Sequence, residues 1–168
     1  HTRYIRDWSS DVCSSDLKGI FPTARLHATS NQTITSGVQV IVNFDAVTWD
    51  RVGDDASSDP DFLMAEVANN RLKIRIPGIY SVTGSVRWFG NAGGTRELRI
   101  QINTANLLLD SLLPPEGFAC YQSTTGLFEL AQDDLVTLAV VHTTGSDLAL
   151  IGTGSENKPS LAAVWVAL

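Results

Sequence analysis

Residues 71–88, RLKIRIPGIYSVTGSVRW, contain the pattern that decides the fold. Over residues 71–76 apolar side chains alternate with arginine and lysine, which is the period-two pattern of a strand with one buried and one wet face. Pro77-Gly78 then interrupts the strand, and the alternation resumes over residues 79–89. We therefore predict two antiparallel strands that form a hairpin-like unit.

Further strands are expected on both sides of this unit. Residues 38–44 and 97–103 show the same alternation. Eight to ten strands, separated by Gly, Asn, Asp and Pro turns and without a long 3.6-residue period, predict an all-β fold, an antiparallel β-sandwich or barrel. An alternating βαβ organisation is excluded. The other expected strands are 24–28, 46–50, 118–130, 135–143, 148–151 and 161–168, and residues 107–113 are interpreted as strand plus loop.

Residues 135–143 (LVTLAVVHT) and 161–168 (LAAVWVAL) are apolar at nearly every position. A two-layer sandwich normally leaves the outer face of each sheet in water, so a second cover is needed here. Either loops of the same chain or a neighbouring subunit can supply it. We favour a subunit interface, because a Trp among small residues suits a packed neighbour. The predicted interface residues are Val140, His142, Val164, Trp165 and Val166.

The length and charge of the chain limit the classes of function that it can have. The chain has 168 residues, 43% hydrophobic and 18% charged, which fits one globular domain with its own core. Twelve Lys and Arg against eighteen Asp and Glu give a net charge of −6, which counts against nucleic-acid binding. No window of about 18 uninterrupted apolar residues occurs, so no membrane insertion is expected.

Residues 1–17 do not follow the pattern of the rest of the chain. Within them residues 6–17, RDWSSDVCSSDL, resemble the translation of a common short-read sequencing adapter joined to an incomplete open reading frame. We interpret 1–17 as a non-native, disordered tail and 18–168 as the single domain. On this interpretation the natural N-terminus, with any targeting signal or stalk, is missing. Cys120 is then the one cysteine left, so no disulfide is inferred.

A search for catalytic and metal motifs finds little. The sequence contains no HExxH, CxxC pair, P-loop, GxGxxG or GxSxG, and neither His27 nor His142 has a partner that spacing singles out, so no catalytic residue and no cofactor is predicted. The stretch WDRVGDDASSDPD, residues 49–61, is rich in the hard oxygen ligands that calcium prefers, although a solvated loop has the same composition. The candidate metal ligands, next to Asp50, are Asp54, Asp55, Asp59 and Asp61.

Aromatic residues near loops are candidates for ligand contact. Trp49 and Phe118 lie close to predicted loops, where flat amphipathic rings suit a sugar or a protein partner. Trp88 is in register with the alternating apolar residues after Pro77-Gly78, so we assign it to the core.

Four segments in this order resemble the complement-globular-head and tumour-necrosis-factor-like jelly-roll family, in the version found in phage and bacterial proteins. The most specific parts are residues 77–80, PGIY, and residues 130–136, LAQDDLV. Gln132 stands where the family usually has glycine, so Asp133 or Asp134 must form that turn. The four segments are RLKIRIPGIYSVTGSVRW, TRELRIQIN, STTGLFELAQDDLVTLAVVH and SLAAVWVAL, and the resemblance covers roughly residues 24–168.

The resemblance implies a ten-strand jelly roll that assembles as a compact homotrimer, often on a fibre or stalk, and that acts by binding. Our first hypothesis is a non-enzymatic trimeric head of a phage tail, fibre or bacterial surface protein, which uses its loops to bind a cell-surface glycan or protein receptor. Such a protein belongs to a virion or an extracellular surface. The alternatives are a structural trimerisation module without ligand, or a jelly-roll carbohydrate-active enzyme. The enzyme would need paired carboxylates on inward strand faces, whereas the acidic residues here lie mainly in turns.

Overall fold

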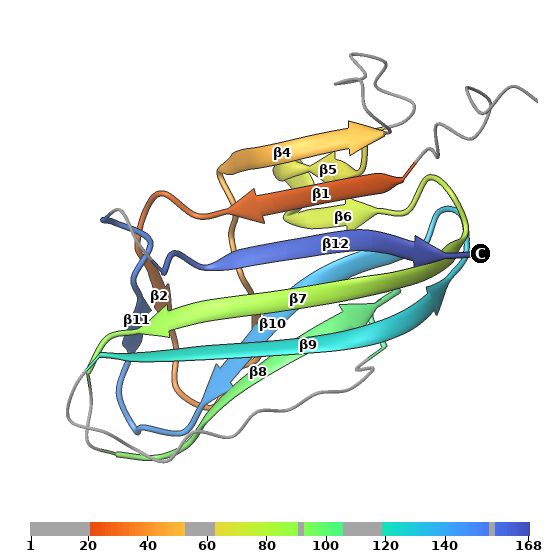
Figure 1. Ribbon diagram of the computed structural model, residues 1–168. Coiled ribbons are helices and arrows are strands. Elements are labelled where there is room, and N and C mark those ends of the chain that lie inside the picture. The colour runs from red at the N-terminus through yellow and green to blue at the C-terminus, as the bar shows by residue number, and fades with distance from the viewer. Residues whose placement is uncertain (1–20, 53–62, 91–92, 106–118, 155–156) are drawn as a thin grey trace, which may run out of the picture.

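A computed structural model describes residues 21–52, 63–90, 93–105, 119–154 and 157–168. Within them the chain forms twelve β-strands in two antiparallel sheets, with one turn of 3-10 helix, η1 (Val67–Asn69), as their only helical element (Figure 1). No helix in this part of the chain is long and apolar enough to cross a membrane. The predicted tail, 1–17, and residues 107–113 lie outside the described residues.

The larger sheet has seven strands. The path β2-β11-β7-β12-β1-β4 runs across it, and β9 pairs with β7 along that strand's whole length. Its strands are β2 (Gln32–Ile34), β11 (Leu148–Leu150), β7 (Gly78–Trp88), β12 (Ser160–Ala167), β1 (Pro22–His27), β4 (Ala46–Val52) and β9 (Cys120–Leu130).

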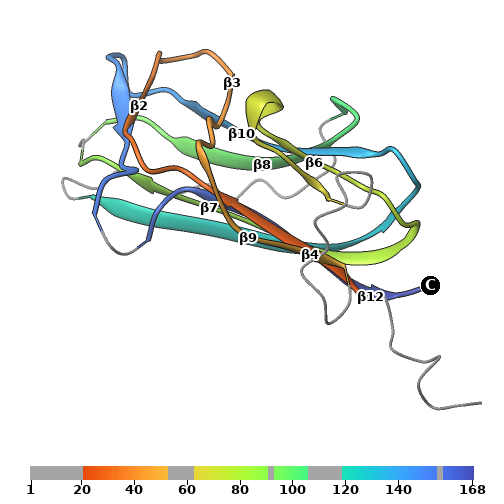
Figure 2. The same cartoon turned by 90° about the horizontal axis from the view of Figure 1, so that it is seen from above.

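The smaller sheet has five strands, in the order β3-β10-β6-β5 with β8 also paired to β10. Seen from above, the two sheets form two layers (Figure 2). The predicted all-β antiparallel sandwich is confirmed. The described residues form twelve strands instead of the predicted ten, because several short segments of two or three residues count as separate strands. The strands of this sheet are β3 (Val40–Ile41), β10 (Leu135–His142), β6 (Arg71–Lys73), β5 (Ala65–Glu66) and β8 (Arg96–Ile102).

The predicted hairpin around Pro77-Gly78 is wrong. Both strands exist, but β6 lies in the five-stranded sheet and β7 in the seven-stranded sheet, so the turn carries the chain from one layer to the other. Gly78 has a φ of 152°, and a Cβ there would lie 2.4 Å from the indole nitrogen of Trp165 and 2.6 Å from the carbonyl oxygen of Ala167. The close approach of β12 therefore requires glycine at this crossing.

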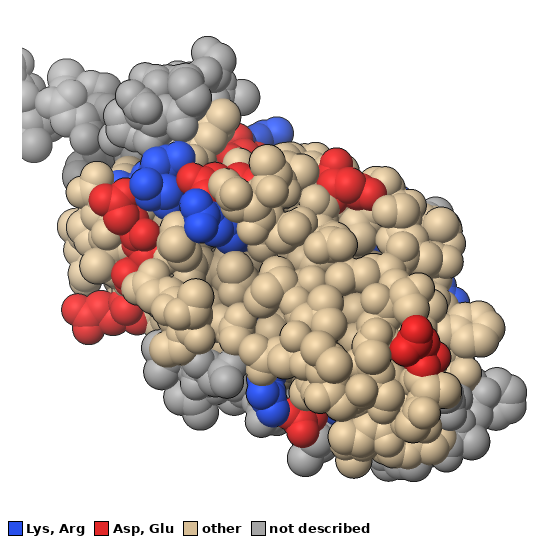
Figure 3. All heavy atoms as spheres, turned by 180° about the vertical axis from the view of Figure 1, so that it is seen from behind, with Lys and Arg blue, Asp and Glu red and all other residues tan. Residues whose placement is uncertain are grey.

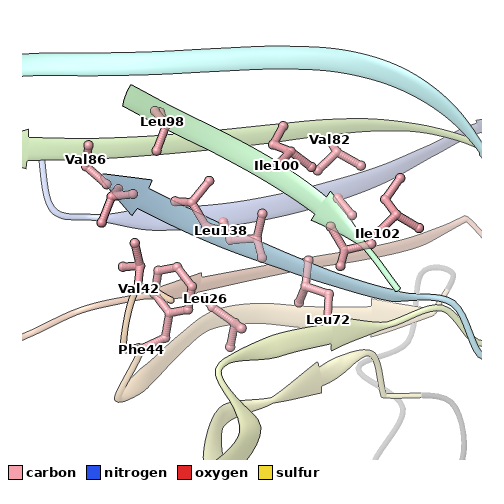
Figure 4. Close-up of a cluster of buried hydrophobic side chains, with 14 of the residues drawn as sticks. Leu26, Val42, Phe44, Leu72, Val82, Val86, Leu98, Ile100, Ile102 and Leu138 are labelled. Atoms are coloured by element: carbon pink, nitrogen blue, oxygen red, sulfur yellow. The ribbon is translucent and has the colours of Figure 1, made fainter. Parts of the chain in front are cut away.

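The core fills the space between the sheets (Figure 4). Alternation along β7 turns Tyr80, Val82, Val86 and Trp88 inward, and all four are fully buried, so the assignment of Trp88 to the core is confirmed. Gly84 on the same face leaves room for the facing sheet, because a Cβ there would lie 2.2 Å from a methyl group of Leu138. Leu26, Val42, Phe44, Leu72, Leu98, Ile100 and Ile102 complete the labelled cluster.

In the turn between β9 and β10, Gln132 occupies the position where the resemblance implies glycine, and the two aspartates after it form the turn. Asp133 follows Gln132 and adopts a left-handed backbone with a φ of 71°. Asp134 then closes the turn, since its Oδ2 accepts a 2.8 Å hydrogen bond from the backbone N–H of Ala131. Aspartate tolerates the left-handed region better than most residues, so both aspartates contribute to the turn.

Candidate interaction face

The outward side of the strands β4, β1, β12, β7 and β9 forms a broad surface, here called the outer face. Four large apolar side chains on β9 and β12, the two strands that flank β7, are exposed on this face, with exposed fractions of 43% to 68%. Exposed single apolar residues are ordinary on protein surfaces, whereas a contiguous group indicates an interaction site. These residues, the apolar patch, are Tyr121 and Leu127 on β9 and Val164 and Val166 on β12.

Register brings the patch together. Val164 pairs with Ser81, and Ser81 pairs on its other side with Leu127, so two aliphatic side chains flank a small hydroxyl side chain across three strands. The row beside it contains Ala162, Thr83 and Thr125. The two threonine hydroxyls lie 2.9 Å apart and satisfy each other. The side chains at the centre of the outer face are thus small or apolar, or hydrogen-bonded to each other, and this surface is suited to burial against a flat partner.

The edge of the outer face over β1 and β4 is polar and basic. Inward residues of β1 are buried, while Thr23, Arg25 and His27 alternate to the outside. Across from them on β4 lie Arg51, which pairs with Thr23, and Trp49, which pairs with Arg25. A register shift between Arg25 and Leu26 marks a β-bulge at this edge, which turns the side chains of β4.

The polar contacts of this edge hold its side chains in place. The Trp49 indole N–H donates to Thr23 Oγ1 over 3.2 Å, and the Arg25 guanidinium carbon lies 5.4 Å from the centre of the Trp49 ring. Thr48 Oγ1 lies 2.9 Å from His27 Nδ1. Burial, followed by the positive charges of Lys158 and Arg25, lowers the pKa of His27 against the opposing effect of Asp45. The lowered pKa favours the neutral imidazole, and the positive charge of this edge comes from Arg25, Arg51 and Lys158.

The predicted interface residues separate into two groups. Val164 and Val166 lie in the apolar patch. Val140 and His142 are 0% exposed, because alternation along β10 turns them into the sandwich. His142 Nε2 lies 2.8 Å from the carbonyl oxygen of Ile34, and its ring packs edge-on against Trp88 at 5.7 Å. A fully buried side chain has no surface to give to a neighbouring subunit, so the interface prediction narrows to the outward residues of β12.

Trp165 is the inward neighbour of those two valines. It is half-buried, packs against the core and lies 5.2 Å from the ring of Phe21. Its indole nitrogen is buried and has no hydrogen-bond partner in the described structure. The Trp165 ring therefore packs β12 against the core and does not present a flat surface to a partner.

The predicted calcium ligands, Asp54, Asp55, Asp59 and Asp61, lie outside the described residues, as does Phe118. Asp50, at the start of the same stretch, points inward, and its two carboxylate oxygens accept hydrogen bonds from the backbone N–H groups of Met64 (3.0 Å) and Ala65 (2.7 Å). Burial raises the pKa of Asp50, and these hydrogen bonds offset part of that effect. Among the residues that the structure describes, no three His, Cys, Asp or Glu side chains gather as a metal site.

The opposite side of the molecule carries groups of charged side chains (Figure 3). Basic and acidic side chains intermingle at one end of this view, while much of the remaining surface is uncharged. The ion pairs of the five-stranded side include Arg71 with Glu66 at 2.6 Å and Lys73 with Asp133 at 2.9 Å. Paired charges of this kind stabilise the local structure modestly and leave little net potential for a partner.

Comparisons with known proteins show the fold. No protein-family model matches the chain, and neither does any curated protein. Eiger TNF from S. frugiperda is 12% identical, with a TM-score of 0.56 over 88% of this chain and 93% of that chain. Murine APRIL at pH 5.0 is 16% identical, with a TM-score of 0.58 over 87% and 99%. The globular domain of zebrafish complement 1qA is 15% identical, with a TM-score of 0.54 over 86% and 97%. The chain therefore has a jelly roll similar to those of tumour-necrosis-factor-like and complement globular heads, as the resemblance predicted.

Proposed function

We propose that the chain is a non-enzymatic binding domain that works as a homotrimer, with the outward side of β12, β7 and β9, where the apolar patch lies, as its subunit interface. The observation that carries this proposal is the apolar patch of Tyr121, Leu127, Val164 and Val166. β7 pairs with both β9 and β12 and brings Leu127 and Val164 into one row, whereas Tyr121 lies beside Arg87, six residues along β9 from Leu127. Removing such a patch from water is a favourable contribution to association.

The patch and the family resemblance support different parts of the proposal. The patch indicates where a partner covers the sheet. The number of subunits comes from the resemblance to the complement-head and tumour-necrosis-factor-like family, and closed cyclic symmetry buries an equal patch on every copy.

The setting of the domain is also part of the proposal. The segments at residues 71–88 and 123–142 resemble the version of the family found in phage and bacterial proteins. We place the domain at the head of a phage tail, fibre or bacterial surface protein, at a virion or extracellular surface. There a trimer presents three copies of each loop to a cell-surface glycan or protein, and three weak contacts combine into one strong attachment.

The solution mass of the full chain tests the assembly. Light scattering during gel filtration, over a hundredfold range of concentration, should give a mass near three times 18.1 kDa throughout. A mass of 18.1 kDa at every concentration contradicts the proposal. The same runs with a chelator test the calcium prediction: dissociation of the trimer supports ligands at Asp54, Asp55, Asp59 and Asp61, and an unchanged trimer leaves the assembly independent of metal.

A further inference from the structure

A pocket opens at the β1–β4 edge of the outer face. It has a volume of about 390 Å³ and is lined by Thr23, Thr48, Trp49 and Arg51. Small-molecule sites generally occupy about 300 to 1,000 Å³, so this pocket has room for one sugar ring or a group of similar size. Thr23 of its lining pairs with Val164 on one side and with Arg51 on the other, so the pocket extends from the border of the apolar patch to the edge strand β4.

The aromatic wall of the pocket is rigid before any ligand arrives. Trp49 is half-buried, its N–H donates to Thr23 Oγ1, and the guanidinium of Arg25 lies over its ring. A ring held on two sides loses little conformational freedom when a ligand binds. An indole also offers a flat apolar surface that complements the C–H face of a pyranose.

The only charged side chain among the described residues that line the pocket is the exposed Arg51, although the whole chain carries −6. The positive charges of Arg25 and Lys158 lie near His27, whose ring is next to Thr48 of the lining. No carboxylate is among the described residues that line the pocket. A guanidinium at such a position can bind a carboxylate through two parallel hydrogen bonds.

The hydroxyls of the pocket complete a set of polar contacts. Thr23 Oγ1 accepts from Trp49 and keeps its own O–H free to donate, and Thr48 Oγ1 lies beside His27 Nδ1. Two hydroxyls, an indole and an exposed guanidinium match the hydroxyls, the apolar face and the carboxylate of an acidic sugar. An acidic peptide side chain would use the guanidinium and leave the indole and the hydroxyls without a counterpart.

We infer that this pocket binds a carboxylated sugar, such as a hexuronic acid residue of an acidic glycan. The inference rests on the proposed binding function, but it places the contact on an edge strand of the sheet instead of on loops. It also assigns the principal contacts to Arg51 for the carboxylate and to Trp49 for the sugar ring.

The test is a titration of the full, isotope-labelled chain with methyl β-D-glucuronide, followed by backbone and indole chemical shifts. Methyl β-D-glucoside, which lacks the carboxylate, is the matched ligand control. We expect saturable shifts centred on Trp49 and Arg51 with the glucuronide, and binding weaker by about tenfold or more with the glucoside. Equal binding of both sugars, or no shifts with either, overturns the inference.

Variants distinguish binding in this pocket from a general effect of positive charge on the sheet. Arg51→Gln should weaken glucuronide binding about tenfold, and Arg51→Lys should restore part of it because a lysine keeps the charge but loses the bidentate geometry. Arg87→Gln is the control, because Arg87 also points outward on this sheet but lies on β7 and outside the pocket. Equal effects of Arg51→Gln and Arg87→Gln contradict the assignment, as does binding of a glutamate-rich peptide at this pocket without any binding of the glucuronide.

The mass of the protein in the same samples distinguishes the two proposals. A trimer that does not bind the glucuronide refutes this inference and leaves the proposed assembly intact. A monomer that binds it refutes the assembly and leaves the pocket assignment standing.

Discussion

Val164 on β12 and Leu127 on β9 lie on opposite sides of Ser81 of β7, in one row across three hydrogen-bonded strands. Each of the two aliphatic side chains is more than two-fifths exposed. In a monomeric sandwich the outer face of a sheet is normally polar, and aliphatic side chains point into the core. The row is therefore best explained by a partner that covers it.

The crossing at Gly78 should be intolerant of any side chain. In Gly78→Ala the new methyl group would meet the indole nitrogen of Trp165 and the carbonyl oxygen of Ala167. We expect a loss of about 2–4 kcal/mol in the free energy of unfolding, measured by chemical denaturation. Gly145→Ala is the matched control, since Gly145 has a φ of 81° but open space around it, and should cost only about 1–2 kcal/mol. Equal losses in the two variants would show that the contact with β12 is unimportant.

The buried pair of Trp88 and Gln122 should behave as a unit. The Trp88 indole N–H donates to Gln122 Oε1 over 3.0 Å, and both side chains are buried. Gln122→Met leaves the indole N–H without its acceptor, and we expect a cost of about 1–3 kcal/mol. The double variant Trp88→Phe/Gln122→Met removes both polar groups, so the two single losses should not add in denaturant unfolding. Strict additivity would mean that this hydrogen bond contributes nothing of its own.

Glu66 should make stability depend on pH in the acid range. Although burial by itself raises the pKa of this carboxyl, hydrogen bonds and positive charge from Arg71, with Asn69 and Arg75, lower it overall. A lowered carboxyl pKa stabilises the fold above the unfolded value, near 4.5, and the stabilisation disappears as pH falls through the folded value. Glu66→Gln should therefore cost about 1 kcal/mol at pH 7 and progressively less below pH 4.5. A cost that stays constant between pH 7 and pH 3, in unfolding curves at each pH, would rule out this linkage.

The fold was predictable where one face of a strand is apolar and the other polar. Along residues 79–88 the alternation alone identifies Tyr80, Val82, Val86 and Trp88 as core, and the structure buries all four. The sheet to which each strand belongs was not predictable. Whether Pro77-Gly78 closes a hairpin or crosses between layers depends on long-range pairing with β9 and β10, which leaves no mark on the local pattern.

The interface residues were harder to predict for a related reason. In residues 135–143 and 161–168 both faces are apolar, so the sequence does not say which set of alternate positions points inward. The structure turns Val140, His142 and Trp165 toward the interior and leaves Val164 outside. Leu127 and Tyr121 were missed as members of the patch. Their signal is an apolar residue on the polar face of an otherwise alternating strand, and such single residues are common on surfaces.

The pocket at the β1–β4 edge was predictable only in part. Trp49 stands out in the sequence as an aromatic residue near a loop, and the structure places it on the outer face. Thr23 and Arg51 come to its side through the pairing of β1 with β4 and the bulge after Arg25. Neither the register nor the bulge can be derived from residue types that are 26 or 28 positions apart in the chain.

The solution mass of Leu127→Asp, compared with that of Val38→Asp, tests directly whether the apolar patch is buried between subunits. Both positions carry exposed apolar side chains, but Leu127 lies in the patch and Val38 lies between β2 and β3, outside it. A charge placed in a buried interface must be desolvated without a partner. We expect a folded monomer for Leu127→Asp and an unchanged trimer for Val38→Asp. An unchanged trimer in Leu127→Asp would contradict the burial of this patch between subunits.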